Sequence, residues 1–263
     1  MEIVGYLAAV LIGGTLGLTG SGGSILTVPI LVYLIGLNPV IATSYSLFVV
    51  GATSSIGGMR FLRKGLVHGP TLVMFGVPSV LTIYLTRLYL MPALPHHLFE
   101  LGKLKVTKEE FVMVLFAFLM VGAACRMIQD RGHPIQFQNP KRPHYLLVCS
   151  QAVLVGLISG LVGAGGGFLI IPALVLLLRL DMKTAVGTSL VLIAGNSLVG
   201  FLGDMFHYSI DWGFLLTFSG LSGVGIWAGA AYAHKINSKA LKKGFGWFVL
   251  CMGVFILLKE IQP

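Results

Sequence analysis

The chain contains the same glycine-rich segment twice. Residues 17–29 read Gly-Leu-Thr-Gly-Ser-Gly-Gly-Ser-Ile-Leu-Thr-Val-Pro, and residues 160–172 read Gly-Leu-Val-Gly-Ala-Gly-Gly-Gly-Phe-Leu-Ile-Ile-Pro, 143 positions later. Residues 17–47 and 160–190 align without a gap and share 14 of 31 residues. Composition alone does not account for so many identities, so we expect two copies of one structural unit.

The composition places the chain in a lipid bilayer. Of its 263 residues 56% are hydrophobic and only 10% are charged, and the mean hydropathy is +0.92. A soluble protein carries roughly a quarter charged residues, which it needs to cover its core. The chain is therefore predicted to be an integral membrane protein.

Long apolar segments predict an all-α polytopic fold with about 8–10 membrane segments. They are too continuous for the alternating pattern of an outer-membrane barrel. Two of them, 24–36 and 167–179, are short against the roughly 20 residues of a membrane-spanning helix. The predicted segments are 2–19, 24–36, 39–58, 68–90, 109–127, 144–163, 167–179, 184–203, 211–233 and 244–260.

The distribution of Lys and Arg predicts that the second copy is inverted. We expect a first repeat at 1–130, a linker at 131–143 and a second repeat at 144–263. If the two apolar halves beside each glycine cluster form a hairpin, each repeat crosses the membrane an odd number of times. One face of the membrane then receives thirteen Lys and Arg residues, and the other face receives five, Arg87 among them. A parallel arrangement shows no such bias. The positive-inside rule then places both termini on the periplasmic side of a bacterial-type inner membrane. Whether the short halves cross fully or are re-entrant stays open.

The glycine clusters are the first candidate site. Such a run breaks a helix, and irregular backbone at membrane depth survives only where it lines a cavity or is buried in protein. The helix that resumes presents its positive end and free N–H groups, which suits a small anion without a fixed buried cation. Close helix packing by small residues is the alternative. The candidate residues are Gly20, Ser21, Gly22, Gly23 and Ser24 in the first copy, and Gly163, Gly165, Gly166 and Gly167 in the second.

Two segments follow the glycine clusters at the same spacing, Ala42–Leu47 and Ala185–Leu190, and two more lie further along the chain, Asn196–Gly200 and Ile210–Trp212. By the clusters and these segments, the chain resembles the TauE/SafE family of sulfite exporters over nearly its whole length. The resemblance implies transport of small sulfur-containing anions such as sulfite, sulfoacetate or other organosulfonates. The copies differ, since Ser21 and Ser24 stand where the second copy has Ala164 and Gly167. The first copy also has His68-Gly69 where the second has Asp211-Trp212. The half-sites are therefore expected to be unequal, and the resemblance does not carry over the identity of the substrate.

Polar side chains after the clusters are the second group of candidates. Their hydroxyl and amide groups are expected to donate hydrogen bonds to the anion or, alternatively, to bond neighbouring helices. These residues are Thr43, Ser44, Tyr45, Ser46, Thr188, Ser189 and Asn196. Asp204 and His207, one helical turn apart, are candidates for proton coupling. All nine acids are expected at or outside segment ends, which disfavours an intramembrane hydrolase.

These features favour a permease that works by alternating access. The alternatives are an anion-selective channel and a carrier for another small oxyanion or a carboxylate. No enzyme activity, cofactor or metal is expected, because no thiolate or imidazole cluster has ligand spacing. The expected partners are the anion, the bilayer, H⁺ or another coupling ion, and a second copy of the chain. Nucleic acid is not expected, since the basic residues lie in loops beside apolar segments.

Overall fold

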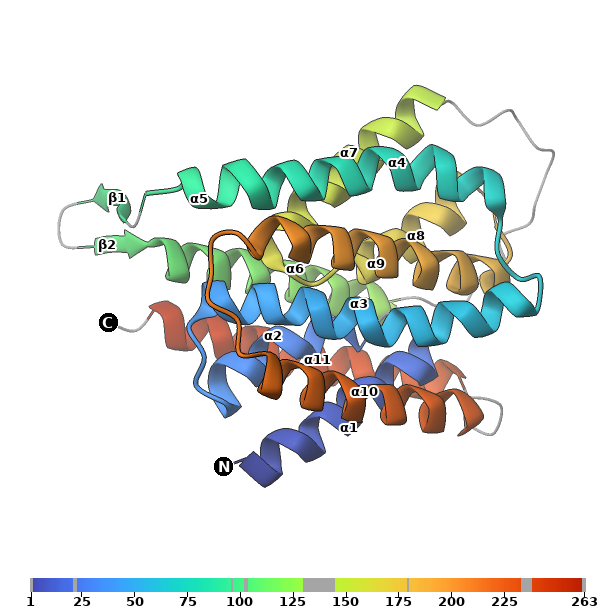
Figure 1. Ribbon diagram of the computed structural model, residues 1–263, viewed down its shortest axis with the longest axis horizontal. Helices are drawn as coiled ribbons and strands as arrows, with labels where there is room; N and C mark the ends of the chain where they lie inside the picture. The colour runs from blue at the N-terminus through green and yellow to red at the C-terminus, as the bar shows by residue number, and fades with distance from the viewer. Residues whose placement is uncertain are drawn as a thin grey trace.

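The computed structural model describes residues 2–20, 23–95, 97–101, 104–129, 145–178, 180–232 and 238–261. These residues form a bundle of helices with one short antiparallel hairpin (Figure 1). Six helical runs among them are long and apolar enough to cross a membrane. The predicted all-α polytopic fold is confirmed.

Each predicted apolar segment corresponds to a helix. The hairpin replaces part of a predicted loop, and the predicted linker 131–143 lies outside the described residues. The first half contains α1 (Glu2–Thr19), α2 (Ser24–Pro29) continued by the π-helix η1 (Ile30–Leu34), α3 (Pro39–Arg63), α4 (Gly69–Leu85) continued by η2 (Thr86–Leu90) and α5 (Met91–Ala93), β1 (His97–Leu101), β2 (Leu104–Thr107) and α6 (Lys108–Gln129). The second half contains α7 (Tyr145–Val162), α8 (Gly167–Leu177), α9 (Met182–Asp204), α10 (Trp212–Tyr232) and α11 (Ser238–Ile261).

The helices that follow the glycine clusters are half the length of a membrane span. The run from α2 through η1 covers 24–34, and α8 has 11 residues. At 1.5 Å per residue each extends at most about 16 Å, against about 30 Å of hydrocarbon. Neither helix can cross the membrane alone.

The two halves pack in the same pattern. Helices α3 and α9 lie against each other and run in opposite directions (Figure 1). The contact between α1 and α10 corresponds to the contact between α7 and α4. The contact between α3 and α10 corresponds to the contact between α9 and α4. Helix α6 packs against α11. The beginning of α1 and the end of α11 lie at the same end of the bundle (Figure 1).

The correspondence extends to single residues at the same offset of 143 positions. Gly13 of α1 packs against the backbone of Ser222, and Gly156 of α7 packs against the backbone of Ser79. In both contacts a Cβ atom on the glycine would collide with the backbone of the facing helix. The absence of a side chain therefore allows α1–α10 and α4–α7 to approach closely, as small residues do in membrane proteins.

The starts of the two central helices are capped by equivalent residues. Asn38 Oδ1 accepts a hydrogen bond of 2.9 Å from Val40 N at the start of α3. Asp181 Oδ2, 143 positions later, accepts one of 3.1 Å from Thr184 N at the start of α9. Hydrogen bonds from the side chain and backbone of Thr184 hold the pKa of Asp181 below its usual range. Both caps satisfy N–H groups that a helix start leaves free.

Close backbone contact between α1 and α10 yields a stability prediction. A Cβ on Gly225 would overlap the backbone of Val10, whereas a Cβ on Gly220 of the same helix meets nothing within 4 Å. Gly225→Ala should lower the free energy of unfolding by about 1–3 kcal/mol, and Gly220→Ala should leave it unchanged. Thermal melting of the detergent-solubilised variants checks this. Equal melting temperatures for the two variants would contradict the close approach.

Candidate functional site

Both glycine clusters adopt backbone conformations that other residues avoid. Gly20 has φ +78°, and Gly163, Gly165 and Gly166 have φ +74°, +65° and +74°. This left-handed region costs an ordinary L-residue roughly 1–2 kcal/mol. The predicted helix breaks are therefore present in the described residues, although Ser21 and Gly22 lie outside them.

Each break packs against the central helix of the other half. Gly20 lies against the Val186 side chain of α9, and Gly163 lies against Thr43 of α3. Thr43 and Val186 are equivalent positions, so this is one contact made twice. It buries the irregular backbone of each break within the protein, as a membrane requires.

In the first break, Gly23 lies so close to the backbone of α1 that a Cβ would be 2.5 Å from Leu16 N. Ser24, the first residue of α2, is fully buried.

The second break is surrounded by buried hydroxyl groups. A Cβ on Gly165 would collide with Ser197 Oγ of α9, and a Cβ on Gly166 would collide with Ser159 Oγ of α7. Both serines are buried, and neither hydroxyl has a hydrogen-bond partner in the protein. Helix α8 begins beside them at Gly167, and no side chain caps it. A positive helix end and two unpaired donors therefore lie at one break.

Two of the predicted site residues have a structural role. Tyr45 Oη accepts a hydrogen bond of 2.7 Å from Asp211 N, and Thr188 Oγ1 accepts one of 3.0 Å from His68 N. Thr188 is the counterpart of Tyr45, and Asp211 is the counterpart of His68. The same bond thus ties α3 to the start of α10 and α9 to the start of α4.

The other predicted hydroxyls divide into bonded and unbonded groups. Thr43 Oγ1 donates to Val40 O at 2.7 Å, and Ser189 Oγ donates to Val186 O at 2.9 Å. The buried hydroxyl of Ser46 has no partner among the described residues, whereas the buried hydroxyl of Ser44 interacts with the Asp204 carboxylate.

Asn196 Oδ1 accepts a hydrogen bond of 3.0 Å from Ser79 Oγ, and its Nδ2 has no partner. Asn196 therefore keeps a free amide donor beside Ser197 in the sequence.

Ser54 was missed at the level of the sequence. It is fully buried in α3, and its hydroxyl has no partner. Ser54 is the counterpart of Ser197, so the gap-free alignment, extended past residue 47, would have found it. The central helices α3 and α9 thus carry equivalent unpaired hydroxyls.

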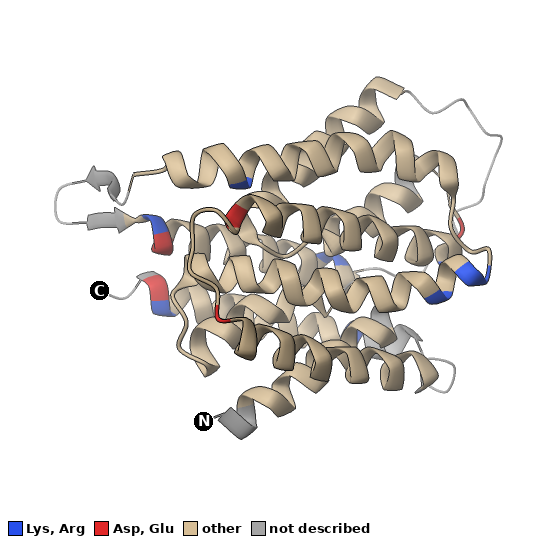
Figure 2. Cartoon of the chain, viewed as in Figure 1, with Lys and Arg blue, Asp and Glu red and all other residues tan. Residues whose placement is uncertain are grey.

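A buried ion pair corrects one prediction. Arg87 was counted as a loop charge, but its side chain is fully buried. Asp204 stands at the end of α9, as predicted, and its side chain is also fully buried, with 2.9 Å between Arg87 Nη1 and Asp204 Oδ2. In Figure 2 the α4–η2 run carries a blue segment and the end of α9 a red one. The described residues therefore contain a fixed buried cation, which the sequence did not predict. Hydropathy shows where a membrane segment ends, but it does not show which helices pack over that end.

Arg87 connects the ion pair to the second break. Its Nη1 also donates to Thr43 Oγ1 at 3.1 Å, and Thr43 is the residue against which Gly163 packs. His207 is exposed, and its Nδ1 lies 3.2 Å from Gly203 O. The side-chain partner of Asp204 is therefore Arg87 and not His207.

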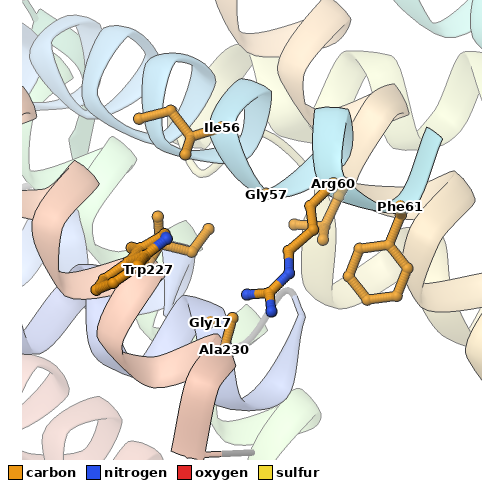
Figure 3. Close-up of a pocket in the computed structure, with 9 residues that line it drawn as sticks. Gly17, Ile56, Gly57, Arg60, Phe61, Trp227 and Ala230 are labelled. Atoms are coloured by element: carbon orange, nitrogen blue, oxygen red, sulfur yellow. The ribbon is translucent and has the colours of Figure 1, made fainter. Parts of the chain in front are cut away.

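An open pocket lies between helices of both halves at the other end of the bundle. It is lined by α1, α3, α9 and α10. Figure 3 shows the Arg60 side chain extending between Phe61 and Ala230 toward Gly17, with Trp227 on the other side. A wider depression continues from it past Arg63 and Lys64. The pocket is apolar inside and basic at its mouth.

Comparisons with known proteins agree with this architecture. Residues 6–256 match the family model described as Sulfite exporter TauE/SafE. A probable membrane transporter protein of Xylella fastidiosa strain 9a5c is 30% identical over 95% of this chain and 92% of its own. The probable membrane transporter protein YunE of Bacillus subtilis is 28% identical over 100% of this chain and 97% of its own. No solved structure matches the chain significantly. The described residues form a multi-span helical bundle with two broken half-length helices, and the match covers nearly the whole chain, so the protein belongs to the TauE/SafE family of membrane transporters.

Proposed function

We propose that the protein is an inner-membrane permease that moves a small sulfur-containing anion, such as sulfite or an organosulfonate, by alternating access. The anion binds between the two glycine breaks, among buried hydroxyls of the central helices. The observation that carries this proposal is the second break, where α8 starts beside the unpaired hydroxyls of Ser159 and Ser197. Burying a hydroxyl with no partner costs free energy, which an anion accepting its hydrogen bond would recover.

The architecture supports inverted repeats, the arrangement on which many secondary transporters are built. Helices α3 and α9 are equivalent and run in opposite directions, and the chain starts and ends at one end of the bundle (Figure 1). Inverted repeats convert one state into the other by exchanging the conformations of the two halves. A transporter of this kind opens to one side of the membrane at a time.

Charge supports the orientation. Arg60, Arg63 and Lys64 are exposed at the pocket end, whereas Arg87 and Lys108 at the other end are buried and so do not count as loop charges. The positive-inside rule therefore places the pocket on the cytoplasmic side and both termini in the periplasm. The basic mouth would concentrate anions from the cytoplasm. This geometry supports export.

Transport in purified proteoliposomes tests the function. With sulfite, sulfoacetate, taurine and sulfate each supplied in turn, we expect saturable uptake of at least one sulfur-containing anion, because a binding site must be emptied in each cycle. Protein-free liposomes are the control. Saturable uptake of none of them would contradict the proposed substrate class, and single-channel currents in planar bilayers would show an anion channel instead.

Two glycine variants separate backbone strain from the site. Gly165 and Gly65 have φ +65° and +67°, so alanine strains both by a similar amount, about 1 kcal/mol. A Cβ on Gly165 enters the position of Ser197 Oγ, whereas a Cβ on Gly65 meets nothing within 4 Å. Gly165→Ala should therefore abolish uptake, and Gly65→Ala should retain it. Equal uptake by both variants would remove the second break from the site.

Ser197 gives a prediction for affinity. Ser197→Ala should raise the half-saturating anion concentration about fivefold, since one hydrogen bond contributes about 1 kcal/mol. Thermal stability should be unchanged, because the hydroxyl has no partner in the protein. Ser79→Ala is the matched control, since Ser79 Oγ bonds both Gly76 O and Asn196 Oδ1, and it should mainly lower stability. A stability loss in Ser197→Ala with unchanged affinity would show that Ser197 is structural.

A further inference from the structure

The buried ion pair and the open pocket occupy equivalent places in the two halves. At the offset of 143, Arg87 corresponds to Ala230 and Asp204 to Phe61, and both counterparts line the pocket beside Arg60. Three more lining residues have counterparts around the ion pair or the helices that carry it. These pairs are Gly17 with Gly160, Leu190 with Leu47, and Ile226 with Ile83.

The bundle therefore holds one guanidinium near each glycine break, and both come from helices of the first half. Near the first break, Arg60 of α3 extends into the open pocket toward Gly17 (Figure 3). Near the second break, Arg87 of η2 is buried and bonded to Asp204 and Thr43. The space beside Arg60 is open to solvent, whereas the Asp204 carboxylate closes the equivalent space beside Arg87.

The ion pair is incompletely satisfied. Arg87 Nε and Nη2 have no hydrogen-bond partner among the described residues, although the side chain is fully buried. A buried ion pair with unpaired donors is a weak source of stability, because desolvation offsets much of the attraction. Two free N–H groups on a planar guanidinium match two oxygens of an oxyanion.

Nearby groups offer the carboxylate a second cation. Lys108, the first residue of α6, is buried, donates a hydrogen bond to Met91 O, and interacts electrostatically with both Arg87 and Asp204. Glu109 is the other charged group that acts on Lys108. Asp204 can therefore leave Arg87 without losing all compensation of its charge.

We propose that Arg87 is the anion-binding cation beside the second glycine break, and that the Asp204 carboxylate occupies it until the transported oxyanion displaces it. This inference rests on the proposed anion transport and names the residue that recognises the anion at the closed end. In the state shown here the anion enters beside Arg60. In the exchanged state the space around Arg87 opens as the pocket does here, and the anion leaves past this guanidinium. The return of Asp204 to Arg87 closes that end again.

Single substitutions of the two partners should act in opposite directions. Uptake of sulfite into proteoliposomes is the assay, with the half-saturating concentration as the readout. Arg87→Gln should raise this concentration at least tenfold, and Asp204→Asn should lower it about tenfold, since charge-assisted hydrogen bonds contribute about 1.5–3 kcal/mol. Lys183→Gln, which removes an exposed positive charge elsewhere, should change nothing. Shifts in the same direction for Arg87→Gln and Asp204→Asn would show that the pair is only structural.

A double variant keeps the test valid if single substitutions fail to fold. Arg87→Ala with Asp204→Phe copies the pair found at the equivalent place beside the open pocket, and it removes both charges of the ion pair together. We expect a wild-type melting temperature and a loss of saturable sulfite uptake. Wild-type uptake by this variant would overturn the role of Arg87 alone. Failure of the unmodified protein to transport sulfite would overturn the proposed function for sulfite, and with it this inference.

Discussion

The fold depends on hiding irregular backbone from lipid. At each glycine break the chain leaves the helical hydrogen-bond pattern, and hydrocarbon offers no replacement partners. The protein solves this by placing each break against the central helix of the other half, Gly20 on Val186 and Gly163 on Thr43. The first break also packs on α1, and the second on α7 and α9, within their own halves. Each half therefore helps to bury the break of the other, and the two copies depend on each other.

The two halves share a frame of equivalent contacts but differ in their charged side chains. The backbone contacts, the helix caps and the Tyr45 and Thr188 hydrogen bonds repeat in both halves. The charged groups do not repeat, since Arg87 and Asp204 have Ala230 and Phe61 as counterparts. A buried pair of this kind adds little stability over apolar side chains. We infer that it is kept for what it binds, and that the symmetric contacts carry the fold.

The sequence alone was sufficient for the architecture but not for the site. Gapless repetition and apolar segment lengths predicted the helices, including the two short ones, because both signals are local. Tyr45 and Thr188 were grouped with Ser44 and Ser46 because hydroxyl type does not reveal the partner, and only packing shows that two are used by backbone N–H groups. Arg87 was assigned to a loop because it stands near the end of an apolar segment. Its burial comes from α3 and α9, which are distant in sequence.

If the proposed function holds, an oxyanion binds at the second glycine break, among the hydroxyls of Ser159 and Ser197. Selenite resembles sulfite in shape and charge, and its selenium scatters X-rays anomalously. A crystal of the protein soaked in selenite should show one anomalous peak within hydrogen-bonding distance of both hydroxyls, and sulfite should compete it away. A peak confined to exposed lysines and arginines would contradict oxyanion binding at this break. A peak at the break that sulfite does not displace would contradict it as well.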